Sequence, residues 1–217
     1  TGDRTWTYQQ VDADASSLAA ALSELGLGRG DRIAVNLPNG IEWIIATLAA
    51  ARLGAVLVPV SPQLSVHDLR YQLRHAEVSC VVTIEQWGAV DFLQRFEELL
   101  GDLPDLQYVV TVGDEDLWYD DRIFQFEDLV SRGAGRAVPD VPDDDTQDLA
   151  VLYTSGTMGK PKGVVLSHRA LVENAVRTAQ VLELSPEDRV LTAVSFSAIF
   201  GFSAMLGTMA SGATLGL

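Results

Sequence analysis

The stretch of sequence that decides the fold reads Leu152-Tyr153-Thr154-Ser155-Gly156-Thr157-Met158-Gly159-Lys160-Pro161-Lys162-Gly163. It combines three hydroxyl side chains, three glycines and two lysines with a proline that stiffens the backbone. Glycines let successive backbone N–H groups turn toward one point, and hydroxyl and ammonium groups add further donors for an anion. Short apolar runs at 149–153 and 163–167 are typical of strands. The pattern predicts a phosphate-binding loop between two strands.

The order of these residues excludes the phosphate loop of kinase-type nucleotide-binding proteins. That loop has the pattern GxxxxGK[ST] and leads directly into a helix. Counting from Gly156, no Gly-Lys-Ser/Thr falls in place, and Lys160 is followed by Pro161. A solvated turn stays open as the alternative, because Gly, Ser, Thr, Pro and Lys are ordinary turn residues.

The segment 153–163 resembles the phosphate loop of the adenylate-forming superfamily, which includes acyl-CoA synthetases, nonribosomal peptide adenylation domains and luciferases. Members usually have Thr where this chain has Met158. Residues 5–8, 30–35 and 53–62 resemble further N-terminal segments of the superfamily, so the resemblance covers essentially the whole chain. Val58-Pro59-Val60-Ser61-Pro62 and Lys160-Pro161-Lys162-Gly163 look most like the acyl-CoA, in particular fatty-acid-CoA, ligases.

Hydrophobic periodicity alternates between strand and helix along most of the chain. Helices are expected at 7–25, 40–53, 65–75, 90–100, 124–130, 168–182 and 202–210, and strands at 33–37, 56–60, 80–84, 108–112, 149–153, 163–167 and 189–194. This alternation predicts an α/β fold, a mostly parallel sheet with helices on both faces. The resemblance implies the N-terminal portion of a large domain, with residues 31–175 as a first lobe and 1–30 and 176–217 as parts of an incomplete second lobe.

Composition narrows the class of protein further. The 217 residues carry a formal net charge of −15, which disfavours a nucleic-acid partner because phosphate backbones attract Lys and Arg clusters. An acidic run at 140–148 is typical of a solvated connector. No apolar stretch has the length of a transmembrane helix. The single cysteine, Cys80, excludes a disulfide framework within the chain and favours a cytoplasmic protein.

The resemblance implies a reaction in which a carboxylate attacks the α-phosphate of ATP, leaving an acyl adenylate that passes to a thiol such as CoA. The resemblance assigns the ATP phosphates to Thr154, Ser155, Gly156, Thr157, Met158, Gly159 and Lys162. Lys162 is the catalytic candidate because it supplies positive charge where two anions meet. Mg2+ would bridge the phosphates, and no metal ligand is assigned within this chain. His67 and His75 are expected to be solvated on one helix, and His168 to lie at a helix start.

The segment 195–202 resembles the superfamily segment that borders the acyl pocket. Phe200, Gly201, Phe202 and Met205 are the candidates for an apolar pocket, which favours a fatty or aromatic acid. Ala198 stands where members commonly carry an aromatic or histidine gate, so either the gate is absent and the pocket is wider, or another residue takes its place. Packing in a protein core explains the same apolar residues without a ligand.

The leading hypothesis is therefore a truncated ATP-dependent acyl-CoA ligase of the long- or medium-chain fatty-acid type. The apolar ending at 212–217 predicts a fragment. The resemblance implies that the groups that bind ribose and drive adenylation are missing from it, so it is expected to be inactive by itself and to associate with a second copy through the uncovered apolar faces of its first and last helices. CoA would be bound only by the complete enzyme. Two alternatives stay open: an adenylation enzyme that loads a carrier protein, and a catalytically inactive nucleotide-binding module.

Overall fold

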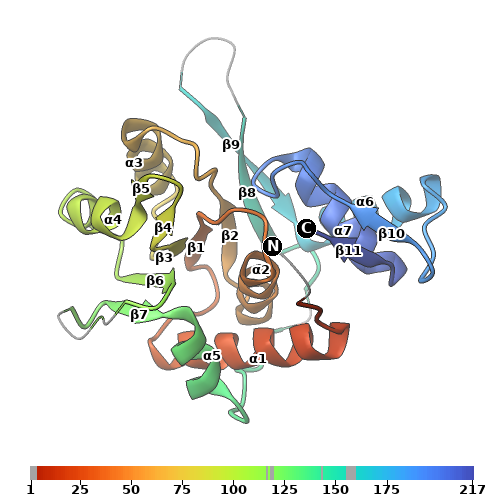
Figure 1. The fold of residues 1–217 in the computed structure, drawn as a ribbon, viewed down its shortest axis with the longest axis horizontal. Coiled ribbons are helices and arrows are strands. Elements are labelled where there is room, and N and C mark those ends of the chain that lie inside the picture. Colours follow the sequence, from red (N-terminus) through yellow and green to blue (C-terminus); the bar gives the residue numbers. More distant parts are fainter. Residues whose placement is uncertain (1–3, 116, 118–119, 143, 155–159) are drawn as a thin grey trace.

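The computed structural model describes residues 4–115, 117, 120–142, 144–154 and 160–217 (Figure 1). The helices are α1 (Tyr8–Glu24), α2 (Ile41–Leu53), α3 (Val66–His75), α4 (Phe92–Leu100), α5 (Phe126–Gly133), α6 (His168–Val181) and α7 (Ile199–Ser211). The strands are β1 (Arg32–Val35), β2 (Val56–Pro59), β3 (Cys80–Ile84), β4 (Gln86–Trp87), β5 (Val90–Asp91), β6 (Tyr108–Val112), β7 (Ile123–Gln125), β8 (Asp148–Thr154), β9 (Lys162–Ser167), β10 (Arg189–Leu191) and β11 (Thr214–Gly216).

The main sheet has seven strands in the order β7-β6-β3-β1-β2-β8-β9. Neighbouring strands run parallel from β7 to β8, and β9 alone turns back antiparallel to β8. Ile33 of β1 lies opposite Leu57 on one side and Cys80 on the other. The mostly parallel sheet predicted from the sequence is thus confirmed.

Helices cover both faces of this sheet, as alternation along β1 demonstrates. Ile33 and Val35 belong to one buried cluster, with α1, α2 and α5, whereas Ala34 belongs to a second, with α3 and α4. Successive strand side chains point to opposite faces, so the two clusters are the two sides of the sheet. Figure 1 shows α1 lying along α2 and α5, in agreement with their contacts.

The C-terminal part joins the first cluster. Helices α6 and α7 pack on each other beside a small parallel sheet of β10 and β11. Phe202 of α7 lies edge-on to Trp43 of α2, with ring centroids 5.6 Å apart. The Tyr8 hydroxyl of α1 donates to the Ala213 carbonyl at 2.6 Å. Because α1 contacts both α2 and the C-terminal part, the division into lobes at residues 30 and 175 stays a prediction.

Two element predictions need correction, both next to short strands. Residues 90–91 form β5, paired with β4, and α4 begins only after Asp91, whose carboxylate accepts from the Gln94 N–H at 2.8 Å. Residues 123–125 form β7 beside β6, and α5 follows from Phe126. A two- or three-residue strand has no periodicity of its own, and its partner strand decides whether it forms.

Candidate functional site

The predicted phosphate loop lies at the tip of the β8–β9 hairpin. Its residues Ser155, Gly156, Thr157, Met158 and Gly159 lie outside the described residues. The two strands that carry it are described, and their last antiparallel pair is Thr154 opposite Lys162. This confirms a strand on each side of the loop.

The two faces of the hairpin tip carry different chemistry. Side chains directly opposite on antiparallel strands share a face, so Thr154 and Lys162 project together, and both are exposed. Tyr153 lies opposite Gly163 on the other face. A Cβ on Gly163 would lie 2.8 Å from Val151 Cγ1 and 3.5 Å from Tyr153 Cζ, so this position has no room for a side chain. Gly163 therefore lets the Tyr153 ring pack over the strand.

Helix α3 contacts the hairpin on the Tyr153 face. The Tyr153 hydroxyl donates to the Gln72 carbonyl at 3.2 Å and lies 2.8 Å from His75 Nδ1. The Tyr71 hydroxyl donates to the Pro161 carbonyl at 3.2 Å. Burial, with a smaller contribution from Tyr71, raises the pKa of Tyr153 to about 12. The phenol is therefore neutral and can act as a hydrogen-bond donor at physiological pH.

Positive charge is concentrated at this tip. Lys160 and Lys162 are the two lysines of the chain, although its formal net charge is −15. Lys160 Nζ lies 5.2 Å from the Tyr71 ring centroid, which is cation–π geometry. Two ammonium groups and the Thr154 hydroxyl are donors without acidic competitors on the same strand ends, a set that suits an anion such as a polyphosphate.

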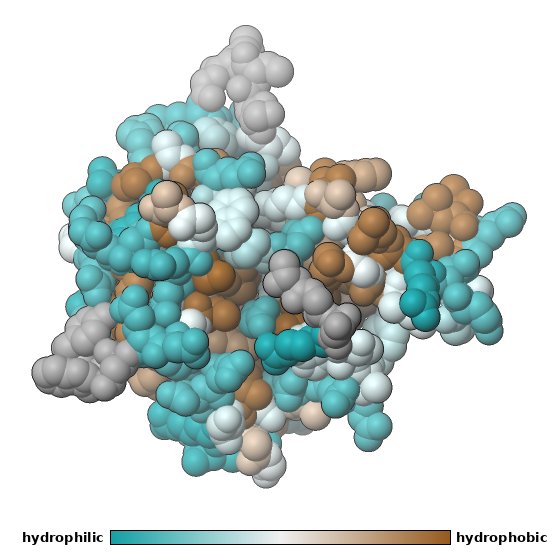
Figure 2. Space-filling view, in the orientation of Figure 1, coloured by the Kyte–Doolittle hydropathy of each residue, from teal (hydrophilic) through white to brown (hydrophobic). Residues whose placement is uncertain are grey.

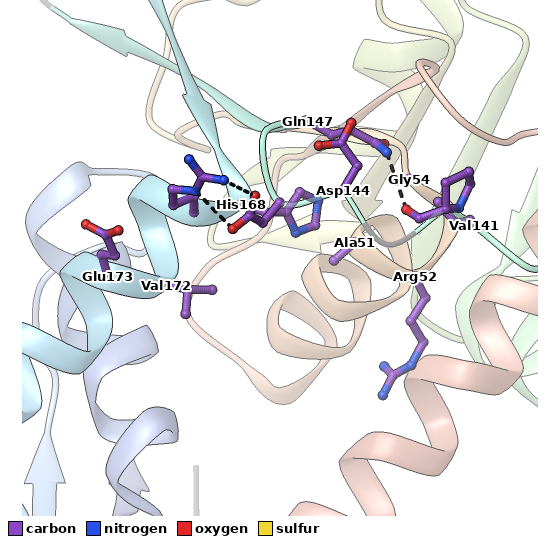
Figure 3. Close-up of a pocket in the computed structure, with 12 residues that line it drawn as sticks. Ala51, Arg52, Gly54, Val141, Asp144, Gln147, His168, Val172 and Glu173 are labelled. Carbon is purple, nitrogen blue, oxygen red and sulfur yellow. Dashed lines mark hydrogen bonds and ion pairs between the residues drawn. The ribbon is translucent and has the colours of Figure 1, made fainter.

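A cavity of about 660 Å³ lies at the opposite end of the hairpin, near Asp148 and Ser167 (Figure 3). It is lined by Ala51, Arg52, Gly54, Val141, Pro142, Asp144, Asp145, Gln147, His168, Arg169, Val172 and Glu173. The Asp145 carboxylate accepts from the Arg169 guanidinium at 2.6 and 2.9 Å. Figure 3 shows the Arg52 side chain turned away from this pair, and its guanidinium contacts Asp12 of α1. Within the lining Asp145 pairs with Arg169, whereas Arg52 pairs with Asp12 and Glu173 with Arg177, both of which lie outside the lining.

His168 starts α6 beside that cavity, and Ser167 caps the helix by accepting from the Ala170 N–H at 3.3 Å. The backbone N–H of His168 donates to the Gln147 carbonyl at 3.0 Å. Burial lowers the pKa of the imidazole, and the Asp145 charge opposes this in part. A helix-start role for His168 is confirmed by these contacts.

The residues predicted for the acyl pocket do not lie on one surface. Phe200 is 71% exposed at the start of α7, whereas Phe202 and Met205 are fully buried in the core beside Trp43. Gly201 is packed against the Ser195 carbonyl, where a Cβ would clash. In this arrangement Phe202 and Met205 offer no surface to a ligand, so their role in a substrate pocket stays a prediction.

Sequence reasoning missed three residues whose side chains join segments distant in the sequence. Tyr71 and His75 reach the loop base from α3, and their spacing of four residues, which places both on one helix face, is the signal that could have found them. Asn39 joins distant segments: its amide donates to the Val194 carbonyl at 2.9 Å and accepts from the Phe196 N–H at 2.8 Å. No local pattern marks Asn39.

Comparison with known proteins finds relatives over most of this chain. A sequence model of the AMP-binding enzyme family matches residues 1–217. Acetyl-coenzyme A synthetase of Mycolicibacterium smegmatis is 33% identical over 86% of this chain, and 4-coumarate–CoA ligase 2 of Oryza sativa subsp. japonica is 33% identical over 80%. The solved apo structure of Mycobacterium smegmatis MbtA matches 99% of the chain with a TM-score of 0.87 at 28% identity.

These similarities extend over part of each larger protein. The chain spans 21% of the acetyl-coenzyme A synthetase, 31% of the coumarate ligase and 39% of the MbtA chain. Among the helices of the described ranges, none is long and apolar enough to cross a membrane.

Proposed function

The chain belongs to the AMP-binding enzyme family, and on this premise we propose that the whole protein is an ATP-dependent ligase that joins a carboxylic acid to CoA through an acyl adenylate. One observation carries the proposal. Both lysines of an acidic chain lie where the chain leaves a loop that two strands present, across the hairpin from the exposed Thr154. That concentration of donors suits the phosphates of ATP.

The residues take the following roles in this proposal. Thr154, Ser155, Gly156, Thr157, Met158, Gly159 and Lys162 bind the ATP phosphates. Lys162 lowers the cost of bringing a carboxylate toward a phosphate, because both reacting groups are anions and Lys162 adds a fixed positive charge. Mg2+ would supply further neutralising charge. A preorganised cation of this kind makes a protein nucleophile unnecessary.

The acid is proposed to be a medium- or long-chain fatty acid. The exposed Phe200 at the start of α7 and the resemblance of 195–202 to a segment that borders the acyl pocket support this substrate class. The relatives are named for acetate and 4-coumarate, so aromatic and short acids belong in any test. Loading of a carrier protein is the alternative acceptor reaction, and Met158 in place of the usual Thr motivates a module that binds nucleotide without turnover.

The decisive experiment is acid-dependent exchange of pyrophosphate into ATP by the whole protein, across short, long and aromatic acids, with and without CoA. Exchange with a fatty acid and formation of its CoA thioester is the expected result. Exchange without a thioester would replace CoA by a carrier protein, and no exchange with any acid would leave the binding module as the better proposal. The 217-residue chain assayed alone is expected to form no thioester.

We extend the proposal to the setting of the protein. A cytoplasmic location supplies ATP and CoA and keeps the buried thiol of Cys80 reduced.

Apolar side chains gather over the C-terminal part of the molecule in Figure 2, and Val181, Leu191 and Phe200 are the most exposed of them. Association of two copies of the chain through this face would cover them. Light scattering at rising concentration checks this, and a monomer at every concentration would contradict it.

A further inference from the structure

We propose that α3 is a positioning element for the phosphate loop, with Tyr71 and His75 holding the two strands at its base. The inference rests on the proposed function, because it concerns how the ATP-binding loop is aimed. It concerns residues far from the loop in sequence, on a helix to which no part in ATP binding was assigned above.

The main sheet alone holds the hairpin tip weakly. Strand β8 pairs with β2 at Leu57 and Ala150, and the described residues show no further pair between these strands toward Thr154. Strand β9 is the edge of the sheet, with Val164 and Val165 about half exposed. Beyond Ala150 the two strands therefore depend on each other and on whatever contacts them from the side.

Helix α3 supplies that contact to the strand that enters the loop. The Tyr153 hydroxyl has one hydrogen, which it donates to the Gln72 carbonyl, because a carbonyl can only accept. His75 Nδ1 lies 2.8 Å from the phenol oxygen, a hydrogen-bond distance at which the tautomer of the imidazole decides which atom donates. The His75 and Tyr153 rings also meet edge-on, with centroids 5.8 Å apart. Tyr153 is thus fixed at both its hydroxyl and its ring.

The same helix contacts the strand that leaves the loop. The Tyr71 hydroxyl donates to the Pro161 carbonyl at 3.2 Å, and the Lys160 ammonium lies over the Tyr71 ring. Tyr71 and His75 are neighbours on α3, with ring centroids 5.5 Å apart. One helical turn therefore fixes the spacing of both strands, which sets the direction in which Thr154 and Lys162 project on the opposite face.

The test compares three tyrosine-to-phenylalanine variants of the whole protein. Tyr153→Phe and Tyr71→Phe each remove a hydroxyl at the loop base. Tyr108→Phe is the matched control, because it removes a hydroxyl that donates to the Leu25 carbonyl at 3.0 Å, on the side of the sheet away from α3. We expect the first two to raise the KM for ATP in pyrophosphate exchange about threefold to tenfold, with kcat and the KM for the acid changed less than about twofold.

A second measurement does not need the reaction. Amide hydrogen exchange of the nucleotide-free protein should accelerate in Tyr153→Phe at the hydrogen-bonded one of the two last cross-strand pairs, 153 with 163 or 154 with 162, and stay unchanged there in Tyr108→Phe. His75→Ala should act like Tyr153→Phe, whereas His75→Asn should rescue the KM, because the asparagine amide places a hydrogen-bonding group, donor or acceptor, near the former Nδ1. Rescue separates a hydrogen-bond role from simple loss of packing.

The outcomes separate the two proposals. Equal effects of Tyr153→Phe and Tyr108→Phe on the KM for ATP would overturn the positioning role while leaving the ligase intact. Parallel loss of kcat and of acid affinity would also overturn it, since a generally weakened fold gives that result. Absence of exchange in the unaltered protein would instead overturn the proposed function, and amide exchange at the last cross-strand pairs would still decide whether α3 holds the hairpin.

Discussion

The two ends of the β8–β9 hairpin differ: one end carries lysines that form no ion pair among the described residues, and the other borders a cavity. The loop end, defined by Thr154 and Lys162, carries both lysines, and among the described residues neither of them forms an ion pair. The cavity end, defined by Asp148 and Ser167, borders about 660 Å³ of space, but its Asp145 and Arg169 already pair with each other. Unpaired charge, more than concavity, identifies the end suited to a polyphosphate.

Removing one positive charge from each end should give the largest contrast. Lys162→Ala deletes an exposed cation that we assign to the ATP phosphates, and a charge-assisted hydrogen bond is worth about 1.5–3 kcal/mol. We expect kcat/KM for ATP in pyrophosphate exchange to fall about tenfold to a hundredfold. Arg169→Ala removes the same charge at the cavity end and should change it less than about twofold. Comparable losses in both variants would abolish the distinction between the ends.

A glycine-to-alanine substitution at each end should lower the free energy of unfolding at both ends but affect ATP binding at only one. In Gly163→Ala the new Cβ would lie 2.8 Å from Val151 Cγ1, and Gly54→Ala forces alanine into φ +65° near Val141. Overpacking and left-handed backbone each cost about 1–3 kcal/mol, so both variants should unfold at lower denaturant concentration. Only Gly163→Ala should also raise the KM for ATP. A raised KM in Gly54→Ala would link the cavity end to nucleotide binding.

The smallest expected effect is a pH dependence confined to the cavity end. Burial lowers the pKa of His168 and the Asp145 charge partly restores it, so Asp145→Asn should lower the folded-state pKa of His168 further. A depressed histidine pKa means that the unfolded chain takes up the proton first. Stability is therefore complete above the unfolded value near 6.5 and falls as the pH drops below it, by well under 1 kcal/mol for a group this exposed.

Imidazole NMR titration and denaturant unfolding above pH 5 check this. That range avoids Asp145 itself, whose pKa the Arg169 guanidinium lowers, so that its own contribution is lost only in stronger acid. His168→Asn should remove the dependence between pH 7 and 5. Pyrophosphate exchange at the loop end should not follow the His168 titration, and a shared pH profile would connect the two ends.

Local sequence predicted the parts of the loop end but not their arrangement. Apolar runs on both sides of the glycines indicated β8 and β9, and the helix expected at 65–75 corresponds to α3, which Ser65 caps by accepting from the Asp68 N–H at 3.1 Å. His75 is exposed, as expected, yet its contact with Tyr153 was missed. That contact exists because β8 adds to the sheet beside β2, and strand order is a long-range property that no window of sequence encodes.

In the segment 195–202 and α7, residue type was visible in the sequence but could not tell a substrate pocket from the protein core. Phe202 and Met205 were selected for their apolar character, but the same character serves a core equally well, and the position of Trp43 decides the matter in this structure. Asn39 escaped attention because its two backbone partners lie more than 150 residues away in the sequence. Contacts of this kind follow from the fold and become visible only with it.

Among the described residues β8 pairs with β2 only at Ala150, so the part of the hairpin beyond Ala150 can tilt about that point as a rigid arm. Four residues separate Ala150 from Thr154, so the arm is about 13 Å long at roughly 3.3 Å per residue. A tilt of only about 10° at the pivot would carry Thr154 through about 2 Å, well beyond the range over which a hydrogen bond to a phosphate oxygen keeps its strength. The stiffness of the arm, and thus of the α3 contacts at Tyr153 and Pro161 next to its tip, sets how accurately the protein can hold a triphosphate.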